Sequence, residues 1–463
     1  MKRLLSLLLI CAMMAVCFAG CTGNLLGQHV TSAQSNNEPV KLVVSNWPKE
    51  TDGAKWEQWN RYREDFMAAN PDIEIIPDEW AYDVRTYLLS AATGQVPTLY
   101  NTYYTEVDRI IAAGFARDVT EVAKERGWYD AYDEDIKNLV FRNGRMHLIP
   151  TNCYAMALQI NKNVFEAAGL VNEDGTCMIP ETYEEVLQFS KIIQEKTDAY
   201  GFMITGGWHF MNIAWSFGTT FMENVDGCWR ATFNSPACAE ALQWIKDLKY
   251  EYGLIPETED ISSALVTSLF TSNKLGMTFA EPHNQVMLHS TGFNKNDLIF
   301  AAVPEGSAGR IAQMGGTIYV IDRNASDEQV EAAFRWLEFL GYGPTITEEA
   351  KSNIEAEYDS RLALDRLVGV IPPTVWKEHT ETRQYTIQTI KKKTNVDRNN
   401  FIHYETVDFV LHPEEPINCQ ELYAILGSCI EQVLKSRDAD PAEVLEKAAM
   451  EFQKDYLDKI NYQ

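Results

Sequence analysis

Alternating strand and helix patterns constrain the fold of this chain more than any other feature of its sequence. Short apolar strand patterns, each followed by a helical pattern, occur at 41–47, 73–77 and 98–101. Gly94 and Gly114 close the second and third of these helices, as glycine often does at a helix C-terminus. Strands joined by helices in this order are typical of a largely parallel sheet covered by helices. The sequence therefore predicts an α/β fold for the N-terminal region.

The rest of the chain continues as a mixture of strands and helices. Asn143-Gly144 predicts a tight hairpin turn within 138–150, and Thr182 with Glu185 forms a capping-box pattern before a long helix. Further strands are predicted at 157–160, 275–279, 298–304 and 315–321, and helices at 162–168, 236–252 and 326–340. The remainder, to Gln463, is predicted to be mostly helical. A chain of 463 residues is long enough for two or three domains.

The N-terminus has the pattern of an export signal. Lys2 and Arg3 precede an apolar run over 4–18, which is too short to span a bilayer comfortably. The run ends in "FAGC", which resembles the lipobox of bacterial lipoproteins and implies cleavage before Cys21 and lipid attachment to its sulfur. The sequence thus predicts a signal peptide at 1–20 and a lipidated N-terminus with a flexible tether at 21–39. The alternative is an ordinary secretory peptide with an incidental cysteine.

Charge and motif content exclude several classes of function. The formal net charge of -26 argues against a nucleic-acid partner, because phosphate binding needs clustered Lys and Arg. Six cysteines remain beyond Cys21, none in a CxxC pair, so neither zinc nor another metal is predicted, and their pairing stays open. The sequence contains no G-x-S-x-G, H-E-x-x-H or P-loop motif. We therefore expect a protein that is no enzyme and that carries no cofactor.

A series of motifs along the mature chain resembles one family, the extracellular solute-binding proteins of carbohydrate ABC transporters, of the maltose-binding-protein-like group. The motifs are, in order, "FMAANPDIEI", "LLSAATGQVPTLYNTYYTEVDRIIAAGFARDVTE", "FRNGRMHLIPTNCYAMALQINKNVFEAAGL", "IPETYEEVLQFSKII" and "LFTSNKLGMTFAEPH". Their order and spacing over more than 250 residues carry the resemblance. The chain departs from the family pattern at Thr98, Ile160, Asn273 and His283. These departures leave the predicted fold unchanged, but the resemblance does not identify the sugar.

The resemblance implies a two-lobe, periplasmic-binding-protein-like α/β fold with the ligand in a cleft between the lobes. The first lobe would take 40–152 with 297–345, and the second 153–296 with 346–463. It also implies a monomeric, lipid-anchored binding subunit on the extracytoplasmic face of the cell membrane, whose partners are a carbohydrate, such as an oligosaccharide, and separate permease subunits. Closure about the crossovers between lobes is a known mode of ligand capture in such proteins.

A sugar presents flat C–H faces and a rim of hydroxyl groups, so its site needs aromatic rings together with a few placed polar groups. Residues of these types that follow predicted strands, or that lie at the family's contact positions, are the candidates for ligand binding. They are Trp47, Glu50, Asn101, Tyr103, Tyr104, Tyr154, Trp208, Glu281, His283, Gly315 and Gly316. Each candidate also has an alternative interpretation without ligand contact, as a ring packed in the core or at the hinge, as a loop residue or as a turn glycine. Tyr100, inside the strand, is predicted to pack in the core.

Two other functions remain open on the sequence. A surface enzyme that degrades polysaccharides would also need aromatic and carboxylate side chains in a cleft. The same fold could instead bind a solute that is not a sugar. Incubation with oligosaccharides distinguishes a binding protein from a degrading enzyme. A binding protein gains thermal stability and releases no cleaved sugar, whereas an enzyme releases cleaved sugar.

Overall fold

The computed structural model describes residues 38–258, 260–282 and 291–460. Pro39–Gln463 forms one compact unit, separate from Met1–Glu38. The predicted signal peptide, Cys21 and nearly all of the predicted tether lie outside the described residues, and so does His283. No helix in the described part of the chain has the length and apolar character needed to cross a membrane.

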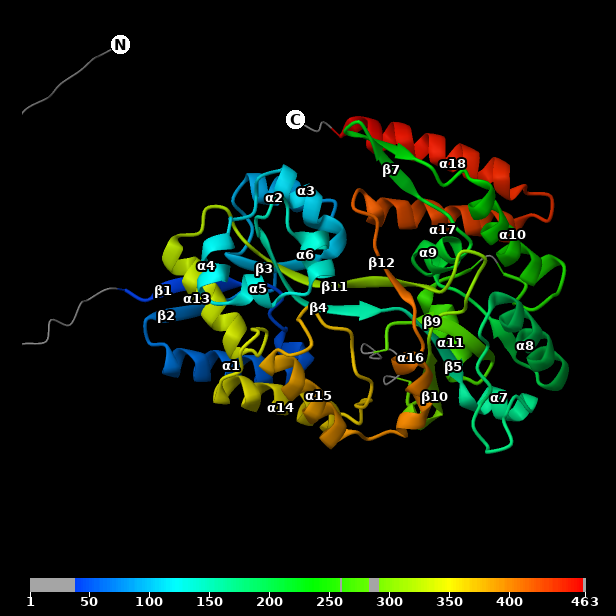
Figure 1. Ribbon diagram of the computed structural model, residues 1–463, viewed down its shortest axis with the longest axis horizontal. Helices are drawn as coiled ribbons and strands as arrows, with labels where there is room; N and C mark the ends of the chain where they lie inside the picture. Colours follow the sequence, from blue (N-terminus) through cyan, green and yellow to red (C-terminus); the bar gives the residue numbers. More distant parts are fainter. Residues whose placement is uncertain (1–37, 259, 283–290, 461–463) are drawn as a thin grey trace, which may run out of the picture. The chain divides into compact units, whose positions relative to one another are not determined.

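Two sheets organise this unit (Figure 1). The larger has the order β12-β11-β3-β1-β2, and β4 pairs with β11 as a sixth strand. Its strands are β1 (Val40–Val44), β2 (Ile73–Pro77), β3 (Leu99–Tyr103), β4 (Leu148–Ala155), β11 (Ile311–Ile321) and β12 (Val410–Pro413). The smaller sheet has the order β10-β5-β9-β6, with β5 (Ala157–Asn161), β6 (Tyr200–Phe202), β9 (Leu275–Ala280) and β10 (Leu298–Ala301). A separate hairpin joins β7 (Met222–Val225) to β8 (Cys228–Ala231).

Helices cover both sheets. Those that precede β4 are α1 (Ala54–Ala69), α2 (Tyr87–Ala92), α3 (Val107–Ala112), α4 (Thr120–Glu125), α5 (Trp128–Ala131) and α6 (Glu134–Val140). Those between β5 and β10 are α7 (Lys162–Ala168), α8 (Tyr183–Lys196), α9 (Gly206–Ser216), α10 (Pro236–Tyr250) and α11 (Ser263–Thr271). The later ones are α13 (Asp327–Phe339), α14 (Glu348–Ala363), α15 (Glu381–Lys393), α16 (Ile402–Thr406), α17 (Cys419–Lys435) and α18 (Pro441–Asp455). Short 3-10 turns are η1 (Glu50–Asp52), η2 (Tyr104–Glu106), η3 (Lys295–Asp297), η4 (Arg398–Asn400) and η5 (Leu457–Lys459).

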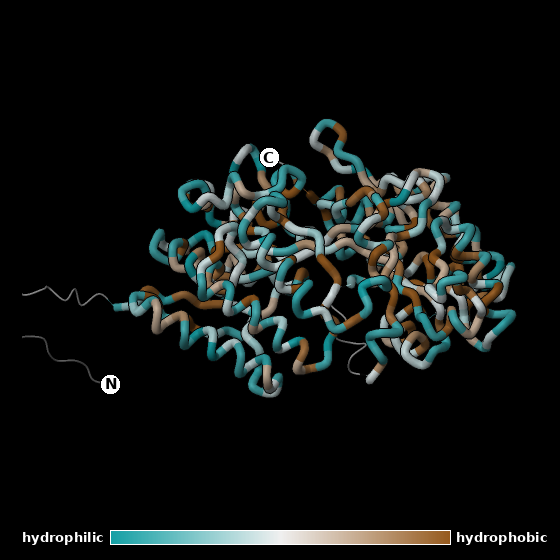
Figure 2. Tube along the Cα trace, turned by 60° about the horizontal axis from the view of Figure 1, so that its bottom comes forward, coloured by the Kyte–Doolittle hydropathy of each residue, from teal (hydrophilic) through white to brown (hydrophobic). Residues whose placement is uncertain are grey.

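Each sheet has its own hydrophobic core, so the protein has two lobes. One core surrounds β1, β3 and α13, and the other surrounds β5, β9, α9 and α17. Figure 2 shows hydrophobic residues along the interior of both lobes and hydrophilic residues along much of the outer surface. The strands β1, β2 and β3 are parallel, whereas β11 runs antiparallel to β3 and β4. These findings confirm the predicted two-lobe α/β fold.

The lobes are divided along the chain differently from the prediction in two places. The prediction assigned 297–345 to the first lobe, but β10 pairs with β5 and therefore belongs to the second sheet. It assigned 346–463 to the second lobe, but Val375 and Trp376 pack in the core of the first, where Trp376 stacks on Tyr132 with ring centroids 4.3 Å apart. The segment that carries α14 and α15 therefore packs on the first lobe.

Local signals in the sequence have clear structural counterparts. Gly94 and Gly114 adopt the positive φ angles of 69° and 65° expected after a helix. The side chain of Thr182 caps α8 by accepting a hydrogen bond from the Glu185 N–H at 3.2 Å. The turn at Asn143-Gly144 forms, but only an isolated bridge flanks it, because the preceding residues are helical in α6. The predicted hairpin is therefore reduced to its turn.

Candidate functional site

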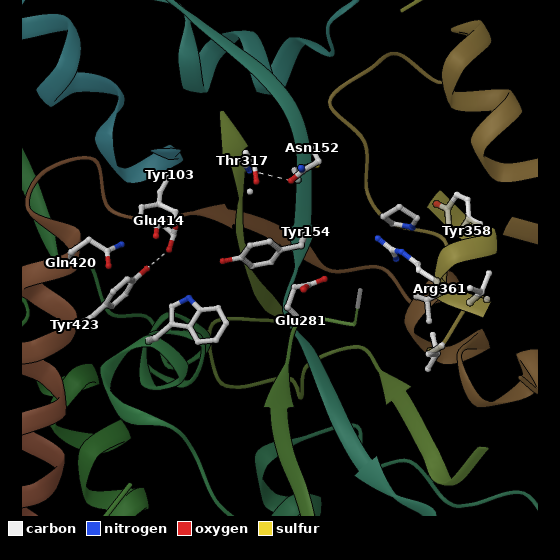
Figure 3. Close-up of a pocket in the computed structure, with 18 residues that line it drawn as sticks. Tyr103, Asn152, Tyr154, Glu281, Thr317, Tyr358, Arg361, Glu414, Gln420 and Tyr423 are labelled. Atoms are coloured by element: carbon white, nitrogen blue, oxygen red, sulfur yellow. Dashed lines mark hydrogen bonds between the residues drawn. The ribbon is translucent and has the colours of Figure 1, made fainter. Parts of the chain in front are cut away.

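A pocket of about 740 Å³ lies where the two sheets meet the C-terminal segment (Figure 3). The larger sheet contributes residues of β3, β4 and β11 to its wall, and the second lobe contributes residues of α9, of α17 and of the chain after β9. The described residues that line it are Tyr103, Asn152, Cys153, Tyr154, Trp208, Glu281, Gly316, Thr317, Tyr358, Arg361, Leu367, Val368, Gly369, Val370, Pro372, Glu414, Gln420 and Tyr423. Aromatic rings alternate with carboxylate, amide and guanidinium groups, which is the mixture that a polar solute with apolar faces requires.

Tyr154 stands in this pocket on β4, the strand that leaves the first lobe (Figure 3). It lies directly across the ladder from Gly315 on β11. A Cβ at Gly315 would be 2.3 Å from the Tyr154 hydroxyl oxygen, and one at Gly316 would be 2.3 Å from the Asn152 carbonyl oxygen. Both glycines were predicted to contact the ligand. Their missing side chains make room for the Tyr154 ring and for the neighbouring strand, whereas Gly316 also lines the pocket, so its ligand contact stays a prediction.

Trp208 lies at the start of α9 and contacts Tyr154 edge to face, with ring centroids 6.3 Å apart. Both rings line the pocket. Gly207, the residue before Trp208, lies against α17, because a Cβ there would be 2.3 Å from the Tyr423 carbonyl oxygen. The glycine thus lets α9 and α17 pack closely, and this packing places Trp208 and Tyr423 on the same pocket.

The tyrosines of β3 and its end point in different directions. Tyr103, at the last position of β3, is 49% exposed and lines the pocket. Tyr100 is fully buried, and its hydroxyl lies 2.7 Å from that of Tyr87. Tyr104 is buried as well, and its hydroxyl donates to the Asn152 carbonyl at 3.1 Å. Of the two candidates Tyr103 and Tyr104, only Tyr103 presents its ring to the pocket.

Three other candidates lie away from this pocket. Trp47 is 4% exposed and packs in the first core, stacked on Trp336 with centroids 6.3 Å apart. Glu50 is an exposed residue of η1. Asn101 lies within β3, where its side-chain oxygen accepts a hydrogen bond from the Asn46 amide. The core position of Trp47 corrects its predicted ligand contact, because a strand end alone did not distinguish a core ring from a pocket ring. Glu50 and Asn101 do not line this pocket, and their ligand contacts stay predictions.

Glu281, directly after β9, lines the main pocket and also an adjoining one of about 460 Å³. Tyr154 and Trp208 line both as well. The second pocket also contains His209, whose Nδ1 accepts a hydrogen bond from the Thr205 N–H at 3.1 Å. Burial lowers the pKa of His209 to about 3, so this imidazole is neutral at physiological pH.

The sequence analysis missed the wall that the C-terminal segment contributes. Tyr358 and Arg361 reach the pocket from α14, and a stretch without regular structure at 367–372 completes this wall. The Arg361 Nε donates to Glu357 at 3.0 Å, one helical turn away. Burial acts to lower the pKa of Arg361, but the carboxylates of Glu357 and Glu281 outweigh it and raise that pKa. No motif marked these residues, because their closeness to Tyr154 arises only from the folded chain.

The second missed group is a buried carboxyl at the end of β12. Glu414 is 8% exposed and lines the pocket. A chain of hydrogen bonds leads to it: Asn212 donates to Gln313 at 3.2 Å, Gln313 donates to the Tyr423 hydroxyl at 2.7 Å, and that hydroxyl donates to Glu414 at 2.6 Å. Burial raises the pKa of Glu414 to about 7. No local signal marked Glu414, because the sequence predicted the rest of the chain to be mostly helical and no strand was expected at β12.

Comparison with known proteins agrees with this arrangement. A binding protein of Brucella abortus strain 2308 is 24% identical over 382 residues, which cover 76% of this chain and 88% of the relative. An ABC substrate-binding protein from Listeria monocytogenes, solved in complex with cycloalternan, shares the fold with a TM-score of 0.67 at 16% identity, covering 90% of this chain and 99% of that one. UgpB from Mycobacterium tuberculosis, in complex with glycerophosphocholine, matches with a TM-score of 0.65 at 14% identity, covering 90% and 98%.

The family model of bacterial extracellular solute-binding proteins matches residues 47–341, which is more than half of the 463 residues. The matched region contains all of the first sheet except β1 and β12, and the whole of the second. With two lobes and a ring-lined pocket where they meet, the chain belongs to the family of bacterial extracellular solute-binding proteins.

Proposed function

We propose that this protein is the lipid-anchored, substrate-binding subunit of an ABC importer and that it clamps an oligosaccharide between its two lobes without performing chemistry. The observation that carries the proposal is the convergence of Tyr103, Tyr154 and Trp208, from three different elements, on one pocket. Such rings suit the C–H faces of sugar units, and the carboxylates and amides around them suit the hydroxyl rim. A separate permease would receive the solute.

The related structures support this proposal and also define its nearest alternative. The Listeria protein binds the saccharide cycloalternan, whereas the Mycobacterium protein binds glycerophosphocholine. The fold is therefore compatible with sugars and with other polar solutes. A thermal-shift screen of oligosaccharides and small polar metabolites separates the two, and analysis of the same samples for cleaved sugar tests the competing enzyme function.

Replacing Trp208 with alanine is expected to weaken binding of the best oligosaccharide from that screen by about tenfold or more, equivalent to roughly 1.4 kcal/mol. The reason is the loss of a ring that faces the pocket. Isothermal titration calorimetry measures the affinity, and the thermal midpoint of the free protein checks its folding. Trp229→Ala is the matched control, because Trp229 is also half-buried but lies on the β7–β8 hairpin, away from the residues that line the pocket. Equal affinities for the two variants would refute a stacking role for Trp208.

The lipid anchor is tested separately. Cys21→Ser is expected to move the protein from the membrane fraction to the soluble fraction of fractionated cells, because the thioether to the lipid can no longer form. The parent chain in the same strain is the control, and metabolic labelling with a fatty acid reports the modification directly. If the variant stays in the membrane fraction to the same extent, a different anchor operates.

A further inference from the structure

The carboxyl of Glu414 has an unusual position for a group that lines a ligand pocket. It is 8% exposed and receives one hydrogen bond in the described structure, from the Tyr423 hydroxyl at 2.6 Å. No lysine, arginine or histidine among the described residues forms an ion pair with it. A buried carboxylate without a cation is costly, so the side chain has an unused capacity to bind one.

The hydrogen bonds behind Glu414 make it an acceptor. Because Gln313 donates to the oxygen of Tyr423, the Tyr423 proton is directed at Glu414. Gln313 is itself held from both ends by Asn212, which donates to its side-chain oxygen and accepts from its backbone N–H at 2.9 Å. This series of hydrogen bonds gives one carboxyl oxygen of Glu414 a donor. The carboxyl still lines the pocket, where it can accept a hydrogen bond from a second donor.

Aromatic rings surround the same end of the pocket. Tyr103, Glu414 and Tyr423 lie together on one side in Figure 3, with Tyr154 between them and Arg361. The positive charge of Arg361 is on the opposite side and is already matched by Glu357 at 3.0 Å. A carboxylate among tyrosine rings is the combination that binds ammonium groups, through charge pairing and through attraction to the ring faces.

We propose that the Glu414 end of the pocket binds a positively charged group of the solute, so that the preferred ligands are amine-bearing saccharides. This inference rests on the proposed function and deepens it, because it selects a substrate class within the carbohydrates. Glu281 also lines the pocket but lies within the electrostatic influence of Arg361, so it contributes less to this preference. The formal net charge of the whole chain, -26, draws cationic solutes toward the protein at low ionic strength.

The proposal predicts a specific dependence on pH. The ionisable groups around Glu414 are Glu106 from η2, Glu415 beside it, Tyr154 from β4, and Cys419 and Tyr423 from α17. All of them are neutral or anionic, so a bound ammonium would be the cation that stabilises the ionised form. Since the pKa of Glu414 in the free protein is raised to about 7, binding an ammonium below that pH releases a proton. The preference for the amine should therefore grow as the pH rises from about 5.5 to 7.

The test compares three trisaccharide probes that differ only in the group at C2 of each sugar unit: the β-1,4-linked glucosamine trimer, its N-acetylated form and cellotriose. Calorimetry on the full mature chain should show the glucosamine trimer binding at least tenfold more tightly than cellotriose at pH 6.5 and low salt. Titrations at this pH in two buffers of different ionisation enthalpy should show the release of a fraction of a proton for the glucosamine trimer and none for cellotriose, because Glu414 is only partly protonated at pH 6.5. In Glu414→Gln the ratio of the two affinities should fall toward one, and in the matched variant Glu281→Gln it should fall less. Thermal midpoints check that both variants fold.

Two further probes separate this inference from the proposed function. Choline and its neutral isostere 3,3-dimethylbutan-1-ol carry no sugar unit. If neutral saccharides bind and the glucosamine trimer binds no more tightly, the cation inference is wrong and the carbohydrate function stands. If no saccharide binds but choline binds more tightly than its isostere in a Glu414-dependent way, the cation inference stands and the carbohydrate function is wrong. A ratio that is unchanged in Glu414→Gln would also overturn the assignment to Glu414.

Discussion

Tyr100→Ala is expected to lower the free energy of unfolding by about 3–5 kcal/mol. The ring is fully buried, packs edge to face on Trp80 with centroids 5.5 Å apart, and shares a hydrogen bond with the Tyr87 hydroxyl. Its removal leaves a cavity and also leaves a buried hydroxyl without its partner, and both effects are unfavourable. Urea unfolding followed by tryptophan fluorescence measures the loss, and Trp80 makes the signal sensitive to this site.

Tyr103→Ala, three residues along the same strand, is the matched control. Because that ring is 49% exposed and faces the pocket, its removal should shift the unfolding midpoint little and should weaken ligand binding. The contrast tests whether one strand divides its rings between core and pocket. Similar midpoints for the two variants would mean that the assignment of Tyr100 to the core is incorrect.

The second large effect is expected from Gly207→Ala, which should cost about 1–3 kcal/mol or prevent folding of the second lobe. A Cβ at this position would lie 2.3 Å from a backbone oxygen of α17 and 2.8 Å from the Leu426 Cβ. A helix backbone cannot move aside as a flexible side chain can, so α9 and α17 must separate. The melting temperature and the near-ultraviolet circular dichroism of the variant measure the outcome.

Gly427→Ala supplies the control for this prediction within the same helix pair. Its nearest contact would be the Gly207 backbone nitrogen at 3.7 Å, an ordinary van der Waals distance. It lies inside α17, where alanine is favoured over glycine by roughly 1 kcal/mol, so this variant should be neutral or stabilised. If Gly207→Ala behaves like Gly427→Ala, the close approach of the two helices is not required.

Local patterns were sufficient to predict most of the secondary structure in the first 340 residues. Strand–helix alternation, the glycines that end α2 and α3 and the threonine that caps α8 all depend on residues close together in sequence. They were found at nearly their predicted positions. Tyr103, Tyr154 and Trp208 were also found as pocket rings, because each lies at or near the end of a strand or at a crossover. The family resemblance supplied the two lobes, which periodicity alone does not give.

The rest of the site depends on contacts between distant segments. Trp47 lies near the end of a strand just as Tyr103 does, but α13 brings Trp336 against it and makes it a core residue. Glu414 became a pocket residue because β12 pairs with β11, and no local pattern announces that pairing. The two boundary errors have the same origin, since the partner of β10 and the packing of Trp376 are both set by residues far along the chain.

The C-terminal wall of the pocket has an evolutionary consequence. Of the described residues that line the pocket, ten of eighteen come after residue 341, where the match to the family model ends. The strands β4 and β11 and most of the two lobe cores, in contrast, lie within the matched region. Substitutions in this terminal stretch can therefore alter most of the pocket wall while most residues of the two cores stay unchanged, so the bound solute can change during evolution without a change of fold.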